Sequence, residues 1–346
     1  MAASSLHDAH LTRDDVGAMV ELVRSGVRID PHGSRTHAAI GFPVTDATIA
    51  RAPSGIVRHD PDDLTVTVFA GTPVAELDEL LDRHGQFVPL DPADRNATVG
   101  GTIACGLSGI RRLAYGPLRD QVLEVRYVGA DGEIVKAGGP TVKNVTGYDL
   151  VRLLVGSLGT LGLFVTVTLR CRPSPAARTW WRVRVDGPTA LERGYRAVAI
   201  VSDRNATSVG FEGEAADAAE LRSRLDVIDE CATPTHRDHR HQGRISVAPR
   251  AIGVLTSALD AELADRVDWW AEWGVGTVHV GTDTSEALGV ARAIASRHGG
   301  WLLREAGADD IAPFGVDRPN VHLQQRVKAA FDPLDRFAPG RFGGPA

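Results

Sequence analysis

Hydrophobic positions along the first half of the chain follow helical and strand periods in turn. Residues 11–25 carry apolar side chains near a 3.6-residue period and end at Gly26, which predicts a helix. Residues 64–69 alternate apolar and polar side chains as a strand does, and the turn at residues 71–73 then begins a helix to Leu81. Glycines crowd residues 100–162. Because glycine weakens regular elements but lets backbone approach a ligand closely, this density predicts a binding function.

The pattern changes after Pro173-Ser174-Pro175, which is typical of a linker. Strands are predicted at residues 180–185, 207–211, 245–247, 277–280 and 301–303. Helices are predicted at residues 189–198, 215–228, 259–270, 285–297 and 320–331. This alternation indicates a second, α/β-sandwich domain. We therefore expect three parts, at residues 1–173, 174–312 and 313–346.

Composition excludes several classes of protein. The formal net charge is −6, which disfavours general nucleic-acid binding. No run of about 18 apolar residues is present and the first 13 residues lack a signal-peptide core, so no membrane span and a cytoplasmic location are expected. The three cysteines are too few for a Cys-ligated iron–sulfur cluster and too dispersed for a disulfide framework.

Three stretches could carry chemistry, and each also has a plain structural interpretation. Residues 31–37 could present backbone amides to phosphate, or form an ordinary polar turn. Residues 97–104 could let a flat ring lie against the backbone, or form a tight crossing in the core. Residues 156–162 look like a Rossmann glycine loop, but residues 163–169 after them are strand-like, whereas a Rossmann loop begins a helix.

Taken together, these stretches resemble the FAD-binding domain of the vanillyl-alcohol oxidase/p-cresol methylhydroxylase (PCMH) superfamily. Within it they are most similar to the family of FAD-binding subunits of bacterial glycolate oxidase. The resemblance covers residues 27–173 and returns at residues 326–341. Its motifs are Pro89-Leu90-Asp91-Pro92, Thr98-Val99-Gly100-Gly101-Thr102, Leu107-Ser108-Gly109 with Arg111-Arg112, Tyr115 to Asp120, Lys143 to Leu150, Gly156 to Gly162, and Lys328 to Pro333 with Pro339-Gly340-Arg341.

The resemblance implies an α+β fold. Two small subdomains would enclose FAD, a smaller α/β-sandwich (ferredoxin-like) cap would follow, and a C-terminal helix would return to the FAD domain. It implies that the loop at residues 33–36 holds the pyrophosphate and that the other glycine-rich stretches lie near the cofactor. The residues it assigns to FAD are Gly33, Ser34, Arg35, Thr36, Pro89, Thr98, Gly100, Gly101, Thr102, Asp120, Tyr148, Gly156, Gly159, Thr160 and Gly162.

Two features of the phosphate loop bear on how FAD is held. Arg35 stands where the family usually has glycine. If the backbone there needs a positive φ, arginine costs about 1 kcal/mol or more; alternatively its guanidinium contacts phosphate. His32 and His37 lie in the loop where some relatives link FAD covalently, but their match to a linking position is poor, so non-covalent FAD is expected.

Oxidation of a 2-hydroxy acid needs a hydride acceptor, a base for the hydroxyl proton and a cation for the carboxylate. Arg111 and Arg112 are candidates for the cation, or form a solvated or inter-subunit basic pair, and no base can be named. Residues 235–241 contain three histidines, which could bind metal or form an exposed loop. The glycine- and histidine-rich metal motif of related dehydrogenases is absent, so no metal is assigned.

The resemblance also implies partners, namely a second, catalytic flavoprotein and an iron–sulfur subunit, through which the chain could be peripheral to a membrane. The expected function is an FAD-dependent oxidoreductase subunit of a glycolate-type (2-hydroxy-acid) dehydrogenase that passes electrons to a partner. Two alternatives stay open at this point. One is a non-catalytic assembly subunit whose FAD is structural or absent, and the other is a stand-alone alcohol oxidase.

Overall fold

A computed structural model describes residues 13–139, 149–234, 239–315 and 320–343. The chain forms two compact units, each with its own core. The first unit combines Met1–Gly109, Pro117–Ser174 and Pro319–Ala346, and the second combines Ile110–Gly116 and Pro175–Arg318. The short segment at residues 110–116 therefore packs with the second unit, which a contiguous division of the sequence does not provide for.

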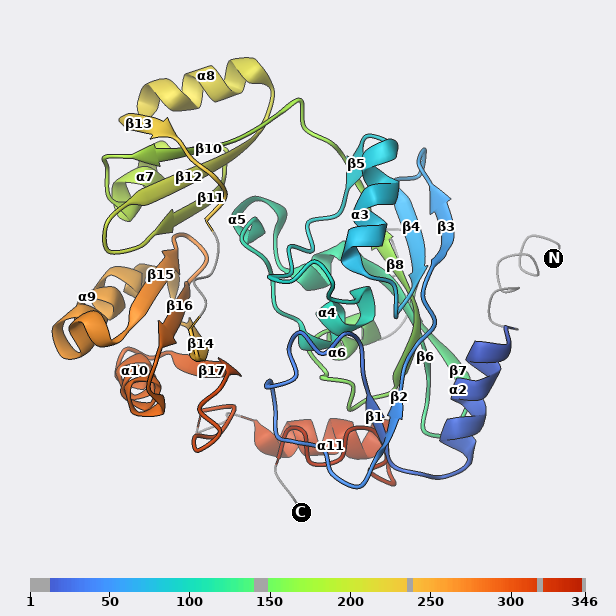
Figure 1. Ribbon diagram of the computed structural model, residues 1–346. Helices are drawn as coiled ribbons and strands as arrows, with labels where there is room; N and C mark the ends of the chain where they lie inside the picture. The colour runs from blue at the N-terminus through green and yellow to red at the C-terminus, as the bar shows by residue number, and fades with distance from the viewer. Residues whose placement is uncertain (1–12, 140–148, 235–238, 316–319, 344–346) are drawn as a thin grey trace. The chain divides into compact units, whose positions relative to one another are not determined.

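The first unit is built on a five-stranded antiparallel sheet in the order β3-β4-β8-β6-β7 (Figure 1). The central strand β8 is buried along most of its length because helices cover both faces of the sheet. The strands are β3 (Ile56–Asp60), β4 (Thr65–Phe69), β6 (Val122–Val128), β7 (Ile134–Gly138) and β8 (Leu163–Arg170).

Helices pack on the two faces of this sheet through separate apolar clusters. On one face lie α3 (Val74–Arg83), α4 (Val99–Cys105) and α6 (Leu150–Leu154), whose Leu77, Ile103 and Leu154 are fully buried. On the other face α2 (Asp14–Arg24) buries Val16 and Val23. Side chains of β4 point to both faces of the sheet and contribute to both apolar clusters. Val66 and Val68 belong to the first cluster, and Phe69 belongs to the second. This is the two-period pattern that the sequence predicts.

A smaller parallel pair completes the first unit. Strand β1 (Ile29–Pro31) pairs with β2 (Thr48–Ala50), and residues 336–338 lie along β1 through two backbone hydrogen bonds at Ile29, to Arg336 O (2.7 Å) and from Ala338 N (2.7 Å). The chain reaches this position after α11 (Val321–Phe331). The remaining elements of the unit are the pair β5 (Gln86–Phe87) and β9 (Arg172–Pro173) and the 3-10 helix η2 (Leu118–Gln121).

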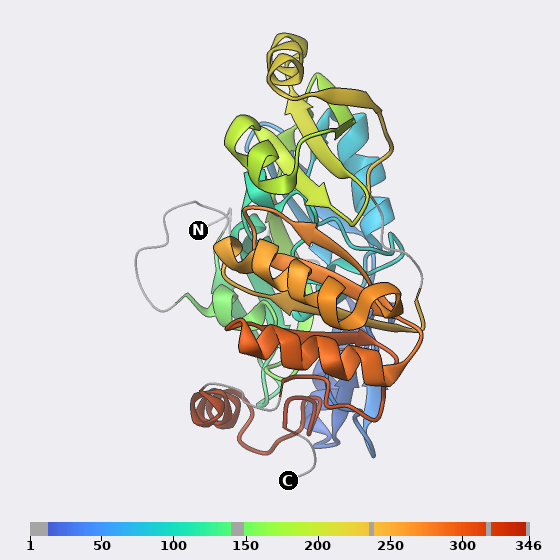
Figure 2. The same cartoon turned by 90° about the vertical axis from the view of Figure 1, so that its left-hand side faces the viewer.

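The second unit contains the same βαββαβ topology twice. The first copy has the strand order β13-β10-β12-β11 and the second β15-β16-β14-β17. The copies join edge to edge where Val201 and Ser202 pair with Glu272 and Ala271, which gives one eight-stranded antiparallel sheet. Figure 2 shows α9 and α10 lying across one face of this sheet. The elements are β10 (Ala177–Val183), α7 (Gly187–Arg193), β11 (Ala197–Ser202), β12 (Thr207–Gly213), α8 (Ala215–Arg224), β13 (Val227–Glu230), β14 (His241–Ser246), η3 (Pro249–Ala251), α9 (Ile252–Leu263), η4 (Ala264–Arg266), β15 (Asp268–Glu272), β16 (Thr277–Thr282), α10 (Ser285–Arg297), β17 (Trp301–Ala306) and, from residues 110–116, α5 (Arg112–Tyr115).

The predicted mixed α+β architecture is confirmed, but three predicted helices of the second unit extended too far toward the C-terminus. The predicted helix at 259–270 ends at Leu263, and Asp268–Glu272 is a strand. The predicted helices at 189–198 and 215–228 likewise included the first residues of β11 and β13. In each case the strand follows its helix after at most four residues, so helical and strand periods merge in the sequence, and pairing with a distant strand decides between them.

The three cysteines are free thiols, of which Cys171 is buried in the first unit. Burial raises the pKa of the Cys171 thiol to about 12. We expect Cys171 to resist a thiol reagent at pH 8 in the folded protein and to react once denaturant is added. Half-buried Cys231 serves as the control.

The raised pKa of Cys171 also makes stability depend on pH. The thiol keeps its proton in the folded chain up to about pH 12, whereas the unfolded chain loses it near the ordinary pKa of 9.0, so the free energy of unfolding should fall as the pH rises from 9.0 to about 12.

Candidate flavin site

The three glycine-rich stretches, which lie far apart in the sequence, meet in the first unit. A Cβ at Gly33 would overlap Thr98 Oγ1, and a Cβ at Gly159 would lie 3.1 Å from the ring of Pro31. Gly156 N donates to Ile103 O (3.0 Å) and Leu158 N donates to Ala104 O (2.8 Å). The loop at 31–37, the start and end of α4 and the turn at 156–160 therefore form one continuous backbone surface.

The loop at residues 33–36 keeps its backbone amides available. Within the part of the chain that the structure describes, the N–H groups of Gly33, Ser34, Arg35 and Thr36 have no hydrogen-bond partner. Arg35 has φ +65°, so the backbone changes hand inside the loop. Successive amides around such a change of hand form a concave anion-binding nest. These four amides are suited to a pyrophosphate.

The amides at the start of α4 are, by contrast, already used. Val99 N and Gly100 N donate to Thr72 O and Ala70 O (both 2.8 Å), and Gly101 N donates to Thr98 Oγ1 (3.2 Å). The Thr102 hydroxyl donates to Thr98 O. The backbone amides at the start of α4 are therefore bonded within the protein and are not free to donate to phosphate.

The other predicted FAD residues lie in different surroundings. Thr160 is buried beside the meeting point and its hydroxyl donates to Ser157 O (2.7 Å), while Gly162 is crowded by the Tyr127 ring. Pro89 is buried in a segment next to Gly109, where a Cβ would overlap the Asp91 side chain. Asp120 is exposed on η2. Tyr148 lies outside the described residues.

Buried polar atoms at this surface test whether FAD fits. Ser157 Oγ, His32 Nδ1 and Arg341 Nε are buried and have no hydrogen-bond partner among the residues described. Leaving such atoms unpaired costs about 1–3 kcal/mol each, so a partner is expected. A cofactor with phosphates, hydroxyls and a flat polar ring supplies such partners, and the residues present fit FAD.

Arg35 provides a prediction, because its φ of +65° lies in the region that favours glycine. Arg35→Gly should raise the free energy of unfolding by about 1 kcal/mol, since a left-handed side-chain residue carries a cost of that size. Thermal unfolding of the two proteins would measure this gain. A variant that gains stability but loses FAD affinity would show that the guanidinium contacts phosphate. No change in stability would contradict the strain.

The two arginines proposed for a substrate carboxylate lie in the second unit, in different surroundings. Arg111 Nη1 is 3.0 Å from Glu212 Oε1, and Tyr115 OH donates to Glu212 Oε2 (2.6 Å). Arg178 adds a second cation at 3.6 Å from the same carboxylate. Arg112 is exposed, and no described residue forms an ion pair with its side chain. Arg112 is therefore the more available cation.

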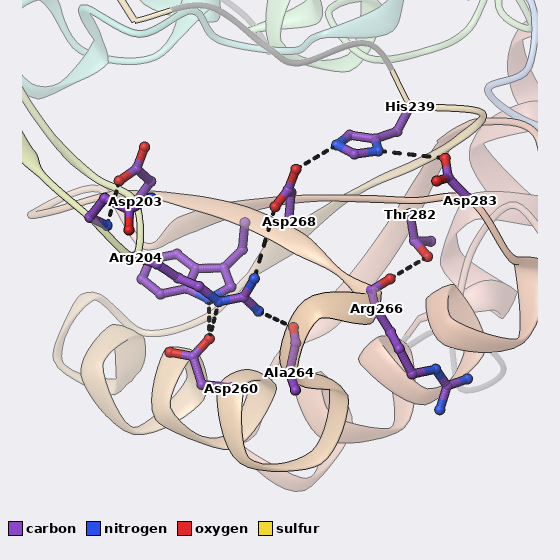
Figure 3. A network of polar contacts seen from close by, with 11 residues as sticks. Asp203, Arg204, His239, Asp260, Ala264, Arg266, Asp268, Thr282 and Asp283 are labelled. Carbon is purple, nitrogen blue, oxygen red and sulfur yellow. Dashed lines mark hydrogen bonds and ion pairs between the residues drawn. The ribbon is translucent and has the colours of Figure 1, made fainter.

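A polar cavity of about 370 Å³ in the second unit was not predicted. Its walls come from the turn between β11 and β12 and from β15 and β16, with Trp270 stacked on His279 at 3.8 Å. His279 also pairs with buried Glu272 (2.7 Å). In Figure 3, Arg204 reaches Asp260 and Ala264 O, and His239 lies between Asp268 and Asp283. Residues 268–270 of β15 and His279 and Gly281 of β16 line the cavity. The predicted helix at 259–270 hid this wall, because it assigned the residues of β15 to a helix.

The three-histidine loop is only partly described. His241 is buried and its Nδ1 accepts a hydrogen bond from Ala308 N (2.7 Å), whereas His236 lies outside the described residues. No group of three or more potential metal ligands occurs in the described ranges. No helix in those ranges is long and apolar enough to cross a bilayer.

Comparison with known proteins places these features in context. Residues 11–138 match the family described as FAD binding domain, which confirms the predicted cofactor domain. The chain is 31% identical to glycolate oxidase subunit GlcE of Escherichia coli (strain K12), over 89% of this chain and 91% of that protein. It is 44% identical to a D-lactate dehydrogenase of Archaeoglobus fulgidus, over 82% of this chain and 78% of that protein. A solved structure of alkyldihydroxyacetonephosphate synthase shares the fold, with a TM-score of 0.69 at 16% identity over 93% of this chain and 74% of that one.

Proposed function

The chain belongs to the family of glycolate oxidase subunit GlcE, and from that premise we propose that it is the FAD-carrying subunit of a 2-hydroxy-acid dehydrogenase complex. It is an FAD-binding oxidoreductase related to glycolate oxidase subunits and D-lactate dehydrogenases. The observation that carries the proposal is the nest of four available amides at residues 33–36, where Gly33 lies against Thr98.

In this proposal each stretch of the site contacts a different part of FAD. The amides of residues 33–36 would hold the pyrophosphate non-covalently, and the small residues of α4 and of the turn at 156–160 would lie along the rest of the molecule. When bound, FAD supplies the hydride acceptor for oxidation of a CH–OH group. The protein would exclude water from the cofactor and hold the substrate.

The substrate cation in this proposal is Arg112, because Arg111 is already bonded to Glu212. Arg112→Met should raise the KM for glycolate or D-lactate at least tenfold, since a lost charge-assisted contact is worth about 1.5–3 kcal/mol. Steady-state kinetics of the assembled complex would measure this. An unchanged KM in Arg112→Met beside a raised KM in Arg111→Met would assign the carboxylate to Arg111.

Partners are proposed from the relatives' names, which denote subunits. We propose a second flavoprotein subunit of the GlcD kind and an iron–sulfur subunit as electron acceptor. The complex would be cytoplasmic, with any membrane contact made through the partners.

A second candidate function is a non-catalytic assembly subunit with structural or absent FAD. The strained Arg35 and the Arg111–Glu212 pair favour it. Purified protein should absorb near 450 nm, and acid should release the flavin. Bleaching by glycolate or D-lactate, alone or with the partner subunits, supports the dehydrogenase subunit. Bound flavin that no 2-hydroxy acid reduces in either setting supports the assembly role, and protein that takes up no FAD with or without its partners overturns the proposal.

A further inference from the structure

One carboxylate at the start of the phosphate loop joins a histidine and an arginine from opposite ends of the chain. Asp30 Oδ2 lies 2.8 Å from His32 Nε2, and Asp30 Oδ1 accepts a hydrogen bond from Arg341 Nη2 at 2.6 Å. The three side chains are 12%, 9% and 13% exposed, respectively. A largely buried, hydrogen-bonded group of this kind is strongly oriented.

Each of the two side chains has a further nitrogen without a partner. His32 Nδ1 and Arg341 Nε are buried and form no hydrogen bond with the described part of the chain. An arginine Nε–H can only donate, so its missing partner is an acceptor. A protonated histidine whose Nε2–H is given to a carboxylate likewise has one N–H left to donate, at Nδ1. Arg341 Nε therefore fits an anionic, oxygen-rich ligand, and His32 Nδ1 fits the same ligand when both ring nitrogens carry a hydrogen.

The backbone holds this group against the amide nest. His32 directly precedes Gly33, and its own amide donates to Ala50 O (2.8 Å), which fixes it at the end of β1. Arg341 is held across the same loop region because Phe42 N donates to Arg341 O (2.9 Å) and the Arg341 side chain crowds Gly41. The C-terminal segment thus brings a cation to the loop whose amides are unpaired.

We propose that His32 and Arg341 form, with the amides of residues 33–36, the binding site for the diphosphate of FAD, and that Asp30 positions both side chains. This inference rests on the proposed FAD site and adds two charged side chains to it. Diphosphate oxygens would complete the hydrogen bonds of both unsatisfied nitrogens.

The test measures FAD binding to deflavinated full-length protein by flavin fluorescence, together with displacement by ADP and the melting temperature of the apoprotein. His32→Leu and Arg341→Met should each raise the Kd for FAD at least tenfold, and the Kd for ADP by a similar factor. Arg341→Lys, which keeps the charge but not the planar fork, should give an intermediate Kd. Asp30→Asn, which removes the positioning carboxylate, should also raise the Kd for ADP.

Two matched variants serve as controls. Arg336→Met removes an arginine of the same C-terminal segment that bonds Val23 O, and His322→Leu removes an exposed histidine of α11. Both should keep the wild-type Kd for FAD. The inference is overturned if the His32 and Arg341 variants bind FAD and ADP within twofold of wild type. The inference is also overturned if the His32 and Arg341 variants raise the Kd for FAD but not the Kd for ADP. It is overturned as well if Arg336→Met raises both Kd values as much as these variants do. Wild-type protein that binds no FAD would instead remove the proposed function itself.

Discussion

Lys328→Met is expected to destabilise the first unit by about 3–5 kcal/mol, which is the usual cost of removing one partner of a buried ion pair and leaving the other charge unpaired. Lys328 Nζ donates to Asp332 Oδ2 (2.6 Å), Thr160 O (2.9 Å) and Phe337 O (2.7 Å). The Asp332 side chain is 0% exposed, so its charge would stay buried without a cation. Urea unfolding of the full chain would measure the loss.

Two further variants identify the cause of that loss. Lys136→Met removes a lysine that is 48% exposed and paired with Glu124, and should cost at most about 1 kcal/mol. Adding Asp332→Asn to Lys328→Met removes the buried charge, so the double variant should recover part of the lost stability. If Lys328→Met costs no more than Lys136→Met, the contacts of Lys328 do not hold the C-terminal segment on the unit.

The same variant should also weaken FAD binding, because Lys328 joins the turn at 156–160 to the segment that supports β1. Its bond to Thr160 O fixes the turn at 156–160, and its bond to Phe337 O fixes the segment that lies along β1. Loss of either contact loosens the surface that the cofactor would need. The Kd for FAD, measured at a temperature where the variant is folded, should therefore rise. A stable variant with unchanged FAD affinity would separate the C-terminal segment from cofactor binding.

Gly106→Ala is expected to cost about 2–4 kcal/mol and to remove bound flavin. Gly106 ends α4 with φ +69°, which already costs an alanine about 1 kcal/mol. A Cβ there would also lie 2.7 Å from Gly156 Cα and 2.9 Å from Gly156 N. Because these are backbone atoms, α4 and the turn at 156–160 must separate. Thermal unfolding and the 450 nm absorbance of purified protein would measure both effects.

Gly85→Ala is the matched control for this substitution. Gly85 also has a positive φ, +63°, but a Cβ there meets no atom within 4 Å. It should therefore cost only the conformational term of about 1 kcal/mol and leave flavin content unchanged. Equal losses in the two variants would mean that the close approach of Gly106 to Gly156 carries no energy.

The local elements of the first unit, the cofactor domain and the family could be predicted from the sequence, because each depends on local periodicity or on family motifs. The helical period of residues 11–25 appears as α2, and the turn at 71–73 begins α3 as predicted. The glycine density of residues 100–162 marked the cofactor domain, since glycine is needed wherever backbones approach closely. The resemblance to glycolate oxidase subunits is confirmed by the similarity to GlcE.

Only the tertiary structure decided which charges meet and which polar atoms are left unpaired. The Asp30–Arg341 and Lys328–Thr160 contacts join residues more than 160 positions apart, and no local pattern encodes them. The sequence made Arg111 a candidate for the substrate cation, and only the fold shows that Glu212 pairs with it. The doubled βαββαβ topology was hidden for a related reason: a strand that follows a helix closely is identified by its distant pairing partner, as Asp268–Glu272 is by β16. Sequence periods specify local elements, whereas long-range pairing and burial determine which side chains act together.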